Sequence, residues 1–140
     1  MKLAKLIAVM LLPFATMAVA APTPAQYIII DHSTTPWMDQ ATAESIWLKK
    51  PSAKFVKLYP AKKWGFLSQV EGGMDATKTC VITARTLMLP VRGKDLVFKP
   101  AKSATTFGHL TNASIEQCKA LASTKLDEAV QALGSALVPN

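Results

Sequence analysis

The stretch at residues 114–137, SIEQCKALASTKLDEAVQALGSAL, is the most regular part of the chain. Ser114 and Gln117 have the spacing of a capping box, which closes the first turn of a helix. Apolar residues then recur every three or four positions, which is the period of one helix face: Ile115, Cys118, Ala122, Leu126, Ala129, Leu133 and Leu137. We expect an amphipathic helix from about Ser114 to Leu133, extending at most to Leu137, with Gly134 as a candidate stop.

Cys118 lies on the apolar face of this helix, and Cys80 lies in the longest strand candidate, residues 77–89 (TKTCVITARTLML). Two cysteines in an exported chain favour a disulfide, whereas catalytic redox pairs usually lie two residues apart. Closing a loop of about 39 residues should stabilise the fold by roughly 4 kcal/mol. We expect a Cys80–Cys118 disulfide that holds the helix on the strand face shared with Cys80: Ile82, Ala84, Thr86 and Met88.

The rest of the chain predicts short strands and one more helix. Thr35 and Pro36 suit the cap and first position of a helix, which must end near Lys50, before Pro51. Residue patterns predict strands at 26–31, 53–59, 64–70, 77–89 (ended by Pro90) and 95–99, turns at 71–73 and 91–94, and a loop at 100–111. We expect an α+β fold: an antiparallel sheet of four to five strands, a β-meander, with the C-terminal helix packed on one face and a shorter N-terminal helix.

Residues 1–20 have the three-part pattern of a secretory signal peptide. Lys2 and Lys5 precede an apolar run, and Ala18 and Ala20 are the small residues that a signal peptidase reads. Residues 21–25 form a proline-containing linker. Cleavage after Ala20 leaves 120 of the 140 residues and lowers the formal net charge from +7 to +5. We expect one small domain at residues 26–140 that is periplasmic or secreted. The length and composition exclude a multidomain protein, a collagen and a polytopic membrane protein.

The positive charge is concentrated in residues 49–70, which hold six lysines and no acidic residue. The candidate binding surface consists of these lysines and one tryptophan: Lys49, Lys50, Lys54, Lys57, Lys62, Lys63 and Trp64. The lysines either protect a sheet edge and keep the protein soluble or form a basic face for an acidic partner. The aromatic residues among them either stack on a ligand or belong to the core: Phe55, Tyr59, Trp64 and Phe66. Nucleic acid is disfavoured because the protein is exported and its cations are nearly all lysine.

The sequence predicts no catalytic, metal or cofactor site. Asp31, His32 and Ser33 are three residue types of a hydrolytic triad, but sequence neighbours cannot form one. They are better explained as a loop in which Asp31 or Ser33 bonds locally. The chain has two histidines, His32 and His109, which do not have the spacing of a zinc motif. Motifs of serine hydrolases, zinc proteases and phosphate-binding loops are missing from the sequence.

We therefore expect a small exported, non-catalytic binding protein. It would use the lysine-rich sheet region to contact an acidic protein or an anionic envelope component, and could inhibit or neutralise its partner. Two alternatives stay open. One is an accessory or structural subunit of an envelope assembly, which predicts an exposed apolar patch or an open sheet edge. The other is a small hydrolase or isomerase using His32 or His109, which predicts a histidine in a cleft beside an acid.

Overall fold

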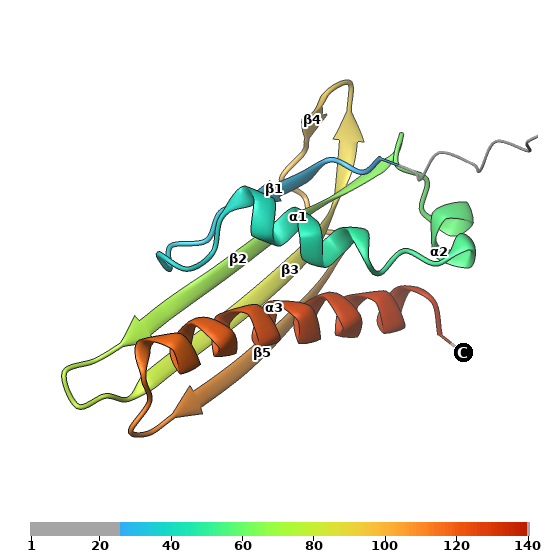
Figure 1. Cartoon of the computed structure of the whole chain (residues 1–140). Coiled ribbons are helices and arrows are strands. Elements are labelled where there is room, and N and C mark those ends of the chain that lie inside the picture. The colour runs from blue at the N-terminus through green and yellow to red at the C-terminus, as the bar shows by residue number, and fades with distance from the viewer. Residues whose placement is uncertain (1–25, 140) are drawn as a thin grey trace, which may run out of the picture.

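The structure, a computed structural model, describes residues 26–139. The signal peptide and linker predicted for residues 1–25 lie outside this range. The described chain forms five strands and three helices (Figure 1): β1 (Ile29–Asp31), α1 (Gln40–Leu48), α2 (Ala53–Leu58), β2 (Trp64–Met74), β3 (Cys80–Arg92), β4 (Asp95–Leu96), β5 (Lys102–Leu110) and α3 (Ile115–Leu137). The predicted α+β class is confirmed.

The sheet is mixed, so the prediction of a purely antiparallel meander is wrong. The strands lie in the order β1-β2-β3, β5 pairs with the other side of β3, and β4 pairs with the C-terminal end of β3. β1 runs parallel to β2, while the other pairs are antiparallel. The parallel pair follows from the connection, because α1 and α2 carry the chain back to the end of the sheet where β1 begins.

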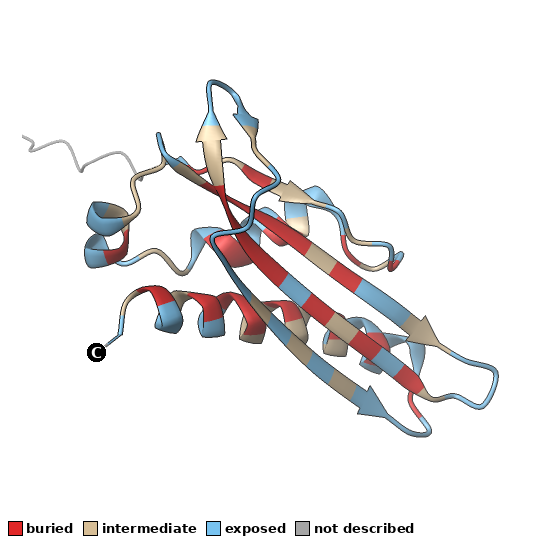
Figure 2. Ribbon diagram, turned by 180° about the vertical axis from the view of Figure 1, so that it is seen from behind, coloured by how far each residue is buried: buried red, intermediate tan, exposed pale blue. Residues whose placement is uncertain are grey.

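Both longer helices cover the same face of the sheet (Figure 1). α3 packs on β3 and β5, and α1 packs on β1. The main core lies between these helices and the sheet. The opposite face carries no helix (Figure 2), and its buried residues form a small second cluster that Leu96 partly covers: Leu67, Leu87 and Leu89. The fold is therefore a two-layer structure with one covered and one uncovered sheet face.

The capping box that opens α3 is confirmed. Ser114 Oγ accepts a hydrogen bond from the backbone N–H of Gln117 (3.1 Å), and Gln117 Oε1 accepts from the N–H of Ser114 (2.8 Å). The helix continues through Gly134 to Leu137. The predicted apolar face is buried apart from Ile115, which is 60% exposed and was wrongly assigned to it. Val130 is buried in addition.

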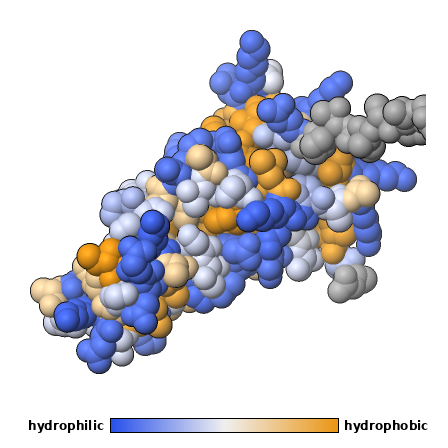
Figure 3. All heavy atoms as spheres, viewed as in Figure 1, coloured by the Kyte–Doolittle hydropathy of each residue, from blue (hydrophilic) through white to orange (hydrophobic). Residues whose placement is uncertain are grey.

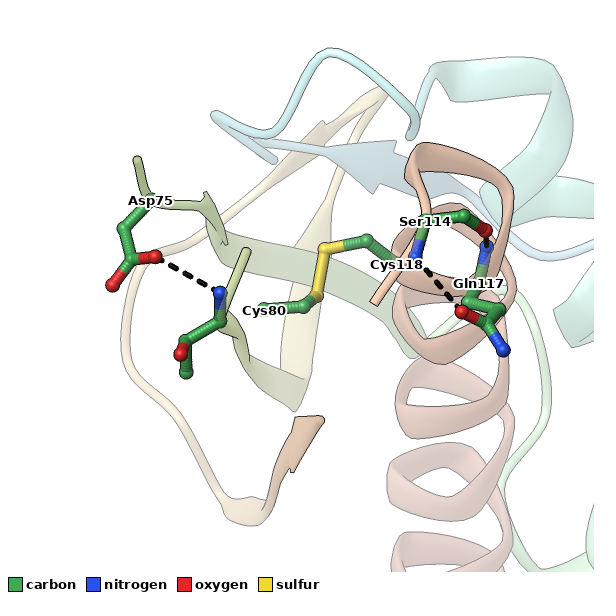
Figure 4. The surroundings of a disulfide bond; sticks show 6 residues. Asp75, Cys80, Ser114, Gln117 and Cys118 are labelled. Atoms are coloured by element: carbon green, nitrogen blue, oxygen red, sulfur yellow. Dashed lines mark hydrogen bonds between the residues drawn. A yellow bond between two sulfur atoms is a disulfide. The ribbon is translucent and has the colours of Figure 1, made fainter. Parts of the chain in front are cut away.

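The predicted disulfide is confirmed. Cys80 is the first residue of β3 and Cys118 lies in the first turn of α3, with their Cα atoms 5.6 Å apart. Both side chains are fully buried, and Figure 4 shows the bond bridging the sheet and the capped end of the helix. Ile82, Ala84, Thr86 and Met88 are buried on the same face, as the two-residue period predicts. The disulfide thus joins the strand face and the helix face that the sequence pairs.

Two segments have a secondary structure other than the predicted one. Residues 53–59 were predicted as a strand, but Ser52 Oγ accepts from the N–H of Phe55 (3.1 Å) and caps the helix α2. Residues 100–111 were predicted as a loop, but they contain β5, which pairs with β3 along its whole length. Both corrections change the candidate binding surface, because α2 carries two of its predicted lysines and β5 forms one edge of the sheet.

Several element boundaries also differ. β2 continues through Gly72 and Gly73, which were predicted as a turn, and the turn follows at Asp75. Gly72 has a φ of +110°, and a Cβ there would lie against the backbone of Val81. Asp75 Oδ1 accepts from the hydroxyl and N–H of Thr77 and from a further backbone N–H. These hydrogen bonds, the one from the Thr77 hydroxyl above all, lower the pKa of the Asp75 carboxyl.

The remaining boundaries shift for local reasons. α1 starts at Gln40, because Asp39 Oδ1 rather than Thr35 caps the helix by accepting from the N–H of Thr42 (2.8 Å). β3 continues past Pro90 to Arg92, and the predicted strand at residues 95–99 shortens to β4. Pro90 is tolerated in β3 because it lies opposite Trp64, the first residue of β2, where the β2–β3 ladder ends. Its missing N–H therefore costs few inter-strand hydrogen bonds.

We expect Ser114→Ala to lower the free energy of unfolding by about 1 kcal/mol, because it leaves the Gln117 N–H without its cap. Urea unfolding monitored by circular dichroism measures this change. Ser135→Ala, an exposed serine near the other end of α3, is the control. Equal midpoints for Ser114→Ala and the wild-type chain would show that the cap contributes nothing.

Candidate functional site

The predicted lysine surface lies on helix and turn residues instead of on a sheet edge. Lys49 follows α1, Lys54 and Lys57 lie on α2, and Lys62 and Lys63 lie in the turn before β2. All five side chains are exposed. The prediction that these lysines lie in the sheet is therefore wrong, because it assumed that residues 53–59 form a strand, and they form α2 instead.

The β3–β4 hairpin adds two cations, Arg92 and Lys94, that are not part of the predicted surface. The N–H of Val91 donates to the carbonyl oxygen of Lys63 (2.9 Å), and Trp64 lies opposite Pro90. The exposed Arg92 and Lys94 at the hairpin tip therefore belong to the same end of the sheet. Figure 3 shows the hairpin as a hydrophilic projection at the top of the molecule. We call the exposed cations of this region the basic end: Lys49, Lys54, Lys57, Lys62, Lys63, Arg92 and Lys94.

The aromatic residues near the lysines pack inside the protein. Phe55 and Phe66 are buried, and their rings contact each other and Tyr27. Trp64 is half-buried and packs edge-on against Tyr59, with ring centroids 6.4 Å apart. The structure therefore supports the core interpretation of these side chains. Burial raises the pKa of Tyr27, whose hydroxyl donates to the carbonyl oxygen of Tyr59 (2.6 Å).

Lys50 differs from the other lysines of the candidate binding surface because it forms an ion pair. Its Nζ lies 3.0 Å from Asp127 Oδ1, so it joins α1 to α3. Beside it, a groove of about 480 Å³ runs between α2 and the C-terminal part of α3. Lys50 and Lys54 line this groove together with the apolar side chains of Phe55 and Val130. Lys54 Nζ also donates to the carbonyl oxygen of Pro139 (3.3 Å).

The uncovered sheet face carries a polar strip across three strands. Cross-strand neighbours form the row Gln69, Arg85 and Thr105, and the next row contains Thr83 and Phe107. A hollow of about 240 Å³ lies over the polar strip. The Phe107 side chain is 61% exposed on this face, next to the exposed His109, with ring centroids 6.2 Å apart.

The two histidines lie at opposite edges of the sheet. His32 directly follows β1 and His109 lies in β5, so two strands spaced by about 4.8 Å separate the strands that carry them. They cannot bind one metal ion together. Ser33 Oγ donates to Asp31 Oδ1 (2.6 Å) and accepts from the N–H of Val70 (2.8 Å), as expected for a loop with local bonds.

The described residues lack two features that would indicate other classes of function. Within residues 26–139, groups of three or more His, Cys, Asp or Glu that could hold a metal ion are not found. In the same part of the chain, none of the helices is both long and apolar enough to cross a membrane.

Fold and surface together define a small two-layer α+β protein with a basic end and one uncovered sheet face. No protein-family model matches the chain, and no curated protein matches it. Among solved structures, a PelC dodecamer from Paraburkholderia phytofirmans is 14% identical, with 79% of this chain and 95% of that chain covered and a TM-score of 0.40. A variant of the same PelC is 12% identical, with 84% and 95% covered and a TM-score of 0.40. Likeness at this level carries no argument about function or assembly.

Proposed function

We propose that the chain is an exported, non-catalytic interaction protein that uses its basic end to bind an acidic protein or an anionic component of the cell envelope. The observation that carries the proposal is that the exposed Lys62 and Lys63, which follow the lysines of α2 in the chain, lie at the same end of the sheet as Arg92 and Lys94 of the β3–β4 hairpin. Residues 49–63 contain no acidic residue, and the hairpin contains one, Asp95, which lies opposite Arg92 in the β3–β4 pair.

The cations of the basic end form no ion pair within the described residues. Residues 26–139 form two ion pairs, Lys50–Asp127 and Lys125–Glu128, and neither uses a cation of the basic end. Clustered, solvated charges of one sign produce a field that attracts oppositely charged partners and accelerates their association. The same cluster destabilises the isolated protein through self-repulsion. A partner that supplies negative charge therefore gains from both effects.

The groove between α2 and α3 adds a concave surface beside the positive charges of the basic end. The half-buried Val138 lines the groove above the buried Phe55 and Val130, and Lys54 lies on the same lining. A partner segment with an apolar side chain next to a carboxylate has the chemistry to fill the groove and meet the lysine. We expect the positive electric field of the basic end to set the rate at which a partner associates, and contacts in the groove to slow its dissociation.

Charge reversal tests the proposal. We expect Lys57→Glu/Lys62→Glu to weaken binding about tenfold or more to each probe that the wild-type chain binds, because both charges lie on the basic end. The probes are vesicles containing an anionic phospholipid and an acidic polypeptide, poly-glutamate, measured by titration at low and high salt. Binding to one probe alone would identify the class of partner. Added salt should weaken the interaction.

Lys78→Glu/Lys119→Glu is the matched control, since both lysines are exposed, lie outside the basic end and change the net charge equally. Equal weakening by the two double variants would show that only net charge matters. Wild-type protein that binds neither probe would also contradict the proposal.

The second candidate function is an accessory or structural subunit of an envelope assembly. Two observations favour it: the sheet face without a helix, and β5 as a nine-residue strand at the margin of the sheet (Figure 2). Exposed sheet edges are sites where other chains add strands. The hydrolase or isomerase alternative stays a hypothesis. Its two histidines are both exposed, and the structure adds no feature that favours it.

A further inference from the structure

β5 presents one complete strand edge to solvent. It pairs with β3 on one side, and no other described strand pairs with it. Figure 2 shows β5 at the margin of the sheet, away from β2. In an antiparallel ladder the N–H and C=O groups of alternate residues point away from the paired strand. The outer edge of β5 therefore offers a row of backbone donors and acceptors to another strand.

The edge lacks the features that usually prevent strand addition. Residues 103–110, SATTFGHL, contain no charged residue and no proline. The register from Cys80 opposite Leu110 to Met88 opposite Lys102 is continuous, so β5 has no bulge. Natural edge strands are typically protected by lysine, proline, bulges or short length. Here Lys102, at the first position of β5, is the one charged residue of the strand.

We propose that β5 pairs antiparallel with β5 of a second copy of this chain, so that the two sheets become one continuous sheet across a two-fold axis. The nine residues of β5 are centred on Thr106. Full overlap places Thr106 opposite its own counterpart, Thr105 opposite Phe107 of the second copy, and Lys102 opposite Leu110 of the second copy. The contact is isologous, as in most homodimers.

The two-residue period fixes which faces join. In a symmetric antiparallel pair the axis is normal to the sheet, so residues of one face meet residues of the same face. Both helical layers then lie on one side of the extended sheet, and both uncovered faces lie on the other. Phe107, which is 61% exposed in the single chain, is flanked by the backbone and Thr105 of the second copy.

The helix-facing side of β5 is shaped for a close approach of α3. Ala104, Thr106 and Gly108 are small or short residues, and a Cβ on Gly108 would lie 2.6 Å from Lys125 Cε. Thr106 Oγ1 donates to the carbonyl oxygen of Lys125 (2.6 Å). Near the axis, Lys125 is paired with Glu128 at 2.7 Å. The two copies therefore meet through neutralised helix surfaces.

Charge argues for a second copy as the occupant. The basic ends of two copies repel each other, so a contact between copies is favoured where it keeps these ends apart. An antiparallel β5 pair does so, because β5 starts near the basic end and finishes at the opposite end of β3. The basic ends therefore lie at opposite ends of the joined sheet. Because residues 103–110 carry no charge, two copies of this edge can pair with little electrostatic repulsion.

Self-association and one charge on the edge test this inference. We expect sedimentation equilibrium of the oxidised protein to show a dimer, and Phe107→Lys to weaken association at least about tenfold by adding charge to the joined strands. Val81→Lys is the matched control, because Val81 is 40% exposed on the same face but lies one strand inward, opposite His109. It should leave the dimer intact.

A cross-link tests the register. Mixing Thr105→Cys with Phe107→Cys should give a disulfide-linked heterodimer under mild oxidation, since these positions face each other. Mixing Thr105→Cys with Val81→Cys should not. A monomer at the highest soluble concentration, or a dimer that Phe107→Lys leaves intact, would overturn the inference. Lys57→Glu/Lys62→Glu should still dimerise, so this result is independent of the proposed function.

Discussion

Replacing both cysteines with alanine should lower the free energy of unfolding by about 4 kcal/mol. The Cys80–Cys118 bond closes a loop that contains all of β3, β4 and β5 and the start of α3. Without the bond, the unfolded chain gains the entropy of that open loop, and the folded chain gains nothing in return. Domains of this size are typically stable by about 5–15 kcal/mol, so the loss is a large part of the total.

Urea unfolding of the double alanine variant measures the change. Reducing the wild-type protein with dithiothreitol should shift its midpoint in the same direction and by a similar amount, while the reductant should leave the variant unaffected. That comparison separates the loss of the cross-link from the loss of two buried side chains. An unchanged midpoint in both reduced wild type and variant would mean that the disulfide does not stabilise this fold.

The packing of α3 on the sheet could be predicted from sequence because the apolar residues of β3 and of α3 each follow a clear period, and the two patterns are consistent with each other. The helix-facing residues of β3 follow a two-residue period, and the buried face of α3 follows a period of three to four. Cys80 and Cys118 lie on the matching faces, so one covalent bond fixes how they pack. Long segments with one apolar face carry this information in many residues, and errors at single positions such as Ile115 do not affect the result.

β5 was missed because neither of its faces is apolar enough to show a period. One face has Ala104, Thr106 and Gly108, where α3 approaches closely, and the other faces solvent. Small and hydroxyl residues in a row therefore resembled a loop. α2 was missed because six residues are too few to distinguish helix from strand, and Phe55 is its one buried residue. The Ser52 cap was the available signal.

Only the part of the candidate site that lies in one continuous stretch of sequence could be predicted. The exposed lysines at residues 49–63 were identified, but Arg92 and Lys94 join them through the β2–β3 register, which brings Pro90 opposite Trp64. Long-range pairing of this kind leaves no signal in a single sequence. The parallel placement of β1 is unpredictable for the same reason, because three residues give no information about strand direction.

Trp47→Ala should lower the free energy of unfolding by about 3–5 kcal/mol. Trp47 is 3% exposed, and its ring stacks on Phe66 with centroids 4.2 Å apart. Its Nε1–H donates to Ser68 Oγ (2.8 Å), and Ser68 is fully buried in β2. Alanine removes the stacked surface, leaves a cavity and leaves the serine hydroxyl without its donor. Leu48→Ala, one residue along and 61% exposed, is the control and should have little effect.

A double-mutant cycle separates the hydrogen bond from the packing. Trp47→Phe keeps much of the apolar contact with Phe66 but leaves Ser68 unpaired, so it should cost about 1–3 kcal/mol for the orphaned hydroxyl in addition to the lost ring. Ser68→Ala in the Trp47→Phe background removes that orphan and should recover part of the loss. Strictly additive effects would show that the two side chains do not interact energetically. Coupling would show that this buried bond helps to hold α1, and with it Lys49 of the basic end, against the sheet.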